Sequence, residues 1–181
     1  EVLHGDAQVA SLLLVLFSVG IGAGSLLCEA LSRGQVEMGL SPVGALGMTL
    51  FAVDLYVASS GLPASELMSI SRFVADHAHW RVMVDLLLLS FFAGIYSVPM
   101  YALIQQQSHN AECARIIAAN NIINALFMIA SSLIAGSMLG AGFSIPEVIC
   151  WTGIANAVVT LGVFVAEPQY LRRFSLWLKG I

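Results

Sequence analysis

Residues 116–146 read IIAANNIINALFMIASSLIAGSMLGAGFSIP and contain no Asp, Glu, Lys or Arg. A helix needs roughly 20 mostly apolar residues to cross about 30 Å of hydrocarbon, and this stretch is longer than that. Similar runs recur along the chain, uncharged except for Asp54 in the second, and short connections that carry most of the charges separate them. The spacing predicts five membrane-spanning helices, near residues 8–29, 39–60, 81–105, 114–139 and 146–166.

The composition of the whole chain agrees with this interpretation. Of its 181 residues, 59% are hydrophobic and only 10% are Asp, Glu, Lys or Arg, and the mean hydropathy is +0.89. A soluble body of this size would lack the polar surface to cover itself, and a net charge of −4 provides no basic patch for nucleic acid. Membrane β-barrels show shorter, alternating segments. We therefore predict an all-α membrane protein, and exclude a soluble enzyme, a disordered chain and a nucleic-acid binder.

The basic residues predict an orientation. Five of them lie on one side of the predicted bundle, and two, Arg72 and Arg81, lie on the other. Basic residues are enriched in cytoplasmic connections, so we expect the amino end outside the cytoplasm and the carboxyl end inside. The five are Arg33, Arg115, Arg172, Arg173 and Lys179.

The two ends of the chain suggest a piece of a longer protein. It begins Glu1-Val2 without Met or a basic stretch, so the first span does not resemble a signal peptide. Residues 167–181 place Leu171, Phe174 and Leu178 on one helical face, with basic residues available for lipid headgroups. We expect this segment to be a cytoplasmic amphipathic helix or the linker to a further domain.

No residue pattern indicates a metal, a cofactor or an enzyme. The three cysteines, Cys28, Cys113 and Cys150, are scattered among apolar residues and are interpreted as packing residues. The four histidines fall in predicted connections, where we expect them to be solvated. There is no phosphate loop and no paired nucleophile and base.

Polar side chains inside the predicted spans are the candidate functional residues. Asp54 lies within the second span, and Asn120, Asn121 and Asn124 lie within two turns of the fourth. Such groups are costly against lipid, so they face neighbouring helices or a water-filled path. Two interpretations stay open for them, interhelical hydrogen bonding and the lining of a substrate path. Asp85 is explained by the positive end of a helix dipole.

Further polar residues could line the same path. Tyr96, Tyr101 and Gln105 occupy the second half of the third span, and Asn156 lies midway along the last. By contrast, Gly20 and Gly24 form a GxxxG pattern in the first span, which is typical of close helix packing.

Three stretches resemble a known family. They are GIGAGSLLCEALSRGQVE at 20–37, VPMYALIQ at 98–105 and RIIAANNIINALF at 115–127. Together they are similar to the lysophospholipid transporter branch of the major facilitator superfamily, and the Asn-rich stretch is the most specific of the three.

The resemblance implies a twelve-helix fold in two halves, of which the five spans would be helices eight to twelve. The amino-terminal half and helix seven would then be missing partners. Residues 29–37 would form the cytoplasmic gating loop, with Glu29, Arg33 and Glu37, although one Arg stands where the superfamily usually has several basic residues.

The resemblance also implies a function. Members of this family move lysophospholipid from the outer to the inner leaflet of the bacterial inner membrane by alternating access, and some continue into a fused acyltransferase. The substrate path would include Asp54, Asn120 and Asn124. Two alternatives stay open: a membrane anchor for a fused acyltransferase, and a major facilitator transporter of another small solute.

Overall fold

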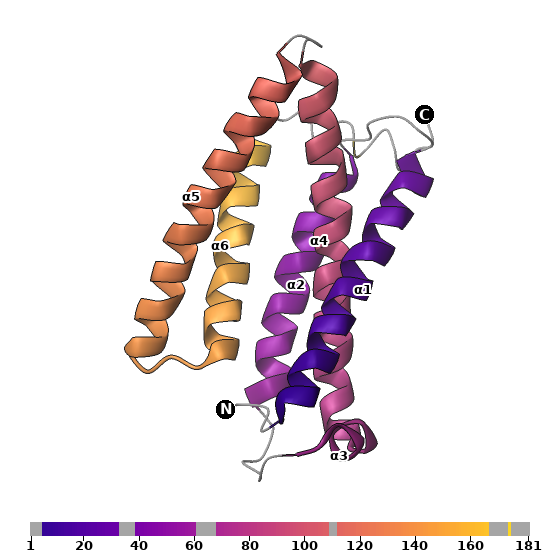
Figure 1. Ribbon diagram of the computed structural model, residues 1–181, viewed down its shortest axis with the longest axis vertical. Helices are drawn as coiled ribbons and strands as arrows, with labels where there is room; N and C mark the ends of the chain where they lie inside the picture. The colour runs from indigo at the N-terminus through magenta and orange to yellow at the C-terminus, as the bar shows by residue number, and fades with distance from the viewer. Residues whose placement is uncertain (1–4, 33–38, 61–67, 109–111, 167–173, 175–181) are drawn as a thin grey trace.

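The computed structural model describes residues 5–32, 39–60, 68–108, 112–166 and 174. Five long helices account for most of them, and a short helix and one 3-10 turn precede the third long helix (Figure 1). In chain order the elements are α1 (Ala7–Ser32), α2 (Leu40–Ser60), α3 (Ile70–Ala75), η1 (His77–His79), α4 (Trp80–Gln107), α5 (Cys113–Gly140) and α6 (Ile145–Ala166).

The five long helices are each long and apolar enough to cross a membrane. Successive long helices run in opposite directions, so the bundle is built up and down (Figure 1). The prediction of five apolar helices is confirmed, with ends that differ by only a few residues from those read off the sequence. The segment 167–181 lies outside the described residues except for Phe174.

Helix α4 is the centre of the bundle, and α1 and α2 pack against it. Gly20, Gly24 and Gly94 let the backbones of α1 and α4 approach closely. A Cβ at Gly24 would overlap the backbone carbonyl of Phe91, and a Cβ at Gly94 would lie 2.5 Å from the carbonyl oxygen of Ile21. The GxxxG prediction is therefore confirmed, and the contact depends on the missing side chains.

Glycines also set the position of α2 between α4 and α6. A Cβ at Gly44 would lie 2.7 Å from the backbone nitrogen of Tyr96 on α4, and one at Gly153 on α6 would lie 2.6 Å from the Cβ of Ala52. Cys28, Leu40 and Ile95 form a buried cluster where α1, α2 and α4 meet. The prediction that Cys28 is a packing residue is confirmed.

Helix α5 is different, because no residue in it is buried. It lies at one edge of the bundle beside α6, on the side away from α1 (Figure 1). Large side chains such as Phe127 and Leu133 are each 70% exposed. The helix therefore presents its surface to whatever surrounds the described bundle.

The segment before α4 contains structure that the sequence analysis treated as a plain connection. Phe73 of α3 is fully buried, and the His79 ring lies 4.2 Å from it between ring centroids. The Trp80 indole donates a hydrogen bond of 2.7 Å to the carbonyl oxygen of Val74. The expectation that His77 and His79 are solvated connection residues is wrong for His79, which is only 4% exposed, because its ring packs on Phe73.

Candidate functional site

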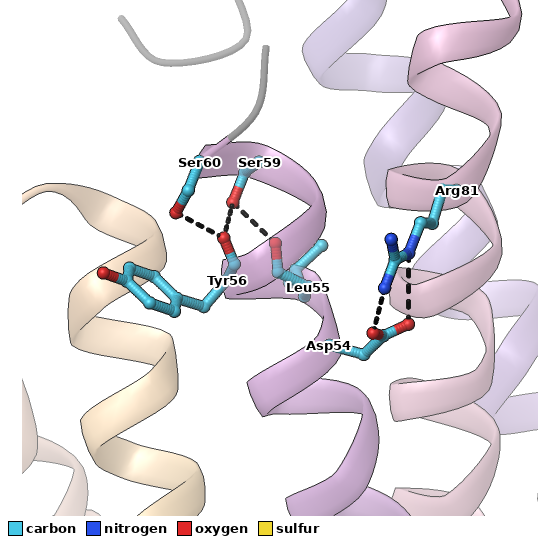
Figure 2. Close-up of polar contacts among 6 residues, drawn as sticks. All are labelled: Asp54, Leu55, Tyr56, Ser59, Ser60 and Arg81. Atoms are coloured by element: carbon cyan, nitrogen blue, oxygen red, sulfur yellow. Dashed lines mark hydrogen bonds and ion pairs between the residues drawn. The ribbon is translucent and has the colours of Figure 1, made fainter.

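An ion pair joins α2 and α4 at the end of the bundle that also holds α3 (Figures 1 and 2). The Nη2 of Arg81 donates to Oδ1 of Asp54, and its Nε lies 3.4 Å from Oδ2. The guanidinium thus faces both oxygens of the carboxylate, a geometry that Arg provides and Lys does not. The side chains of Asp54 and Arg81 are 35% and 54% exposed, so the pair remains open to its surroundings.

Other polar groups near Asp54 do not contact its carboxylate. The hydroxyls of Ser59 and Ser60 donate to carbonyl oxygens of α2, and Tyr56 points away from the ion pair (Figure 2). The local polar partners of Asp54 therefore come from α4 and not from its own helix.

Asp85 lies one helical turn beyond Arg81 and is only 2% exposed. It shares one face of α4 with Arg81, four residues earlier, and the Arg81 side chain is bonded to Asp54. No donor among the described residues reaches its Oδ2. The dipole interpretation is insufficient, because Asp85 is the sixth residue of α4 and the dipole effect falls off within the first turn.

A second polar region is a cavity of about 60 Å³ between α2, α4 and α6. Polar side chains from all three helices reach it. Ser41 is 2% exposed, and its hydroxyl has no hydrogen-bond partner among the described residues. The lining consists of Ser41, Tyr96, Met100, Asn156, Val159, Thr160, Val163 and Phe164.

Asn156 ties α6 to α2 from the wall of this cavity. Its Nδ2 donates to the carbonyl oxygen of Ala45 and to Oγ1 of Thr49, both at 2.9 Å. The Thr49 hydroxyl also donates a hydrogen bond of 3.3 Å to the carbonyl oxygen of Gly153 on α6. Of the two interpretations left open, this geometry supports interhelical hydrogen bonding for the amide nitrogen of Asn156.

The third polar region lies where α4 and α5 approach each other. Asn124 donates a hydrogen bond of 3.1 Å to the hydroxyl of Tyr101. Asn120 and Asn124 are half-buried, whereas Asn121 and Gln105 are exposed. Because α5 has no buried residue, these amides are only partly covered by the described helices.

The predicted site residues are thus divided among three places. Asp54 lies at the α3 end of the bundle, Tyr96 and Asn156 line the cavity, and Tyr101 contacts Asn124 beside α5. Of the predicted gating loop, Glu29 is exposed near the end of α1. The other two residues of that loop, Arg33 and Glu37, lie outside the described residues.

The sequence analysis did not identify Arg81, Asp85 and Ser41 as site residues. A usable signal existed for the first two, because residues four apart on a helix share a face and a third charge, Asp54, lay within another span. Ser41 gave no such signal, since a single serine in an apolar helix is common. Within the described ranges, no group of three or more His, Cys, Asp or Glu side chains could hold a metal ion.

Comparison with known proteins identifies no relative of this chain. No protein-family model, no curated protein and no solved structure matches the chain.

Proposed function

We propose that this chain is part of a secondary transporter that moves lysophospholipid from the outer to the inner leaflet of a bacterial inner membrane by alternating access. The proposal rests on the resemblance of three sequence stretches to that transporter family, and on five helices of membrane-spanning length. The amino end of α1 would be periplasmic, as the distribution of basic residues predicts.

The observation that supports this function best is the group of three amides on α5, which the described helices cover only in part. Asn120, Asn121 and Asn124 project from a helix in which no residue is buried, and among the described residues only Asn124 forms a side-chain hydrogen bond, to Tyr101. Amides are costly against acyl chains, so a helix that carries three of them needs a polar neighbour. A route for a lipid headgroup, bordered by the rest of the transporter, supplies that neighbour.

The chemistry of these groups suits the headgroup of a lysophospholipid. Amide N–H and phenol O–H groups donate hydrogen bonds to phosphate oxygens, and the amide carbonyls accept from hydroxyl or ammonium groups. The apolar surface of α5 around them, which includes Phe127 and Met128 at 70% and 69% exposure, suits the single acyl chain. With its headgroup on the amides and its acyl chain on the apolar surface, the lipid would have polar contacts for its polar part and apolar contacts for its apolar part.

A flipping assay tests the proposal. The full transporter is reconstituted in liposomes that contain a fluorescent lysophospholipid, and Asn124→Leu is compared with wild type. We expect a severalfold loss of transport rate per folded molecule, because the variant removes a headgroup donor. Ser131→Leu, an exposed polar-to-leucine change on the same helix, is the matched control and should retain the wild-type rate.

Two results would contradict the proposal. One is an unchanged rate in both Asn124→Leu and Asn120→Leu, which would remove the amides from the path. The other is acyl transfer to externally supplied lysolipid that persists in cells after an unrelated anchor replaces the five helices. That result would favour the anchor function for a fused acyltransferase.

A further inference from the structure

Asp85 has surroundings that an ionised carboxylate does not tolerate well. It is 2% exposed, and its Oδ2 meets no hydrogen-bond donor among the described residues. Burying a charge without a partner is strongly unfavourable, and such groups become neutral instead. The carboxyl therefore needs either a cation or a proton.

The nearby cation is already engaged. Arg81 faces both oxygens of Asp54, so the pair of Asp54 and Arg81 is neutral by itself. An ionised Asp85 would add a net negative charge in the buried part of the cluster. Asp85 shares a helix face with Arg81, which holds Asp54, and a proton on one of the two carboxyls would supply the donor that two carboxylates lack.

No other charged group among the described residues takes the place of this proton in neutralising Asp85. Helix α1, which packs on α4, has no Asp, Glu, Lys, Arg or His between Ala7 and Cys28, and Asp6 just before it accepts from the backbone N–H groups of Gln8 and Val9. The Nδ1 of His79 in η1 lies 3.5 Å from Oδ2 of Asp76, and its ring packs on Phe73. Glu112 and Arg115 lie at the start of α5, which is at the opposite end of α4 from α3 (Figure 1). The charged groups around Asp85 are therefore Asp54 from α2 and Arg81 from its own helix.

We propose that Asp54 and Asp85 form a proton-binding site, in which one exchangeable proton bridges the buried Asp85 carboxyl and the Asp54 carboxyl held by Arg81. On release, the O–H bond breaks, its electron pair stays on the carboxylate oxygen, and the proton passes to water. Asp54 is the route of exchange, because its side chain is 35% exposed while Asp85 is buried. A metal cation is disfavoured, because the adjacent guanidinium repels it. The site does not depend on the identity of the transported solute.

Infrared difference spectroscopy on the protein in lipid nanodiscs tests the site directly. Labelling aspartate with ¹³C at the side-chain carboxyl restricts the signal from residues 1–181 to four side chains, Asp6, Asp54, Asp76 and Asp85. We expect a C=O stretching band of a protonated carboxyl that shifts in heavy water and disappears as the pH is raised. Asp85→Asn should abolish the band, and Asp76→Asn, which keeps an N-cap acceptor at an exposed position, should leave it unchanged.

A second variant keeps the test decisive if Asp85→Asn fails to fold. In Asp54→Asn the partner carboxylate becomes an amide, so the band should persist but move in frequency, because the hydrogen bond has changed. The proposal is overturned if the band is absent from wild type, if it survives unchanged in Asp85→Asn, or if Asp54→Asn leaves its frequency unaltered. None of these results involves transport, so the failure of the lysophospholipid proposal would be seen separately.

Discussion

Helices α4 and α5 have the same length, 28 residues, and both are apolar enough to span a membrane, yet they occupy opposite environments. Helix α4 is enclosed by α1 and α2, whereas α5 has no buried residue. The difference lies in small residues at the contacts. Glycines of α1 and α2 receive the bulky side chains and backbone of α4, while Gly136 and Gly140 of α5 have no neighbouring atom within 4 Å of an added Cβ.

This comparison shows that apolarity does not decide which helix becomes the centre of a membrane bundle. Lipid tails are as apolar as leucine, so burial against another helix brings no hydrophobic gain. Close packing and interhelical hydrogen bonds decide the arrangement instead. Close packing is extensive around α4 and scarce around α5 among the described residues, which is why α5 is the helix that we propose borders the substrate path.

The largest effect is expected from a glycine at the α4 contact. In Gly24→Leu the new side chain would meet the backbone of Phe91, which cannot move away as a side chain can. We expect a loss of about 1–3 kcal/mol in the free energy of unfolding, the usual range for overpacking. Gly136→Leu on α5 is the control and should be neutral, because its site is open. Thermal unfolding in detergent measures both, and equal losses would break the comparison.

The amide that joins α6 to α2 should have the next largest effect. Asn156→Leu removes two hydrogen bonds of 2.9 Å to α2, so we expect a loss of about 1–2 kcal/mol. Asn121→Leu, the same change at an exposed position of α5, should alter the unfolding free energy by less than about 0.5 kcal/mol. A larger loss in Asn121→Leu would mean that α5 is packed against something at that position.

A smaller effect is expected from the ion pair between α2 and α4. A double-mutant cycle with Asp54→Asn and Arg81→Gln should give a small but measurable coupling, because both side chains are partly exposed and solvent weakens their attraction. Urea or thermal unfolding of the four proteins gives the coupling. Arg72→Gln on α3, combined with Asp54→Asn, is the control cycle and should show none. Equal coupling in the two cycles would show that Arg81 stabilises Asp54 only as a nearby positive charge, without a specific contact.

The smallest effect concerns the contact between α4 and α5. Tyr101→Phe removes the acceptor of the Asn124 hydrogen bond and should cost about 0.6 kcal/mol, the average for such bonds in membranes. The cycle with Asn124→Leu should show that the two changes are not additive. Fully additive losses would mean that the two side chains do not interact in the membrane.

Several features of the fold follow from local sequence signals. The turn Gly140-Ala141-Gly142 ends α5, with Gly142 at φ 97° and the Phe143 N–H bonded to the carbonyl oxygen of Met138 at 3.1 Å. Ser144 and Glu147 begin α6, because the Glu147 carboxylate accepts from both the backbone N–H and the hydroxyl of Ser144. These features depend on residues close together in the chain, so the sequence contains their cause.

The candidate site was less predictable, since its contacts join residues far apart in the sequence. Asn156 and Ala45 are 111 positions apart, and Asp54 and Arg81 are 27 positions apart. Asn156, Asp54 and Arg81 are polar residues in or at the start of an apolar run, which marked Asp54 and Asn156 as candidates but did not identify their partners. The burial of His79 and Asp85 was missed for the same reason, because neither is buried by its own helix.

The sequence by itself determined the number of long helices, their approximate ends and their turns, because hydropathy, length and capping act within about 30 residues. Tertiary structure alone decided that α4 is central and α5 peripheral, that Asp54 pairs with Arg81, and that Asp85 lies buried beside them. Those outcomes depend on how closely pairs of helices can approach. That distance is set by the shapes of two surfaces together and not by the composition of either one.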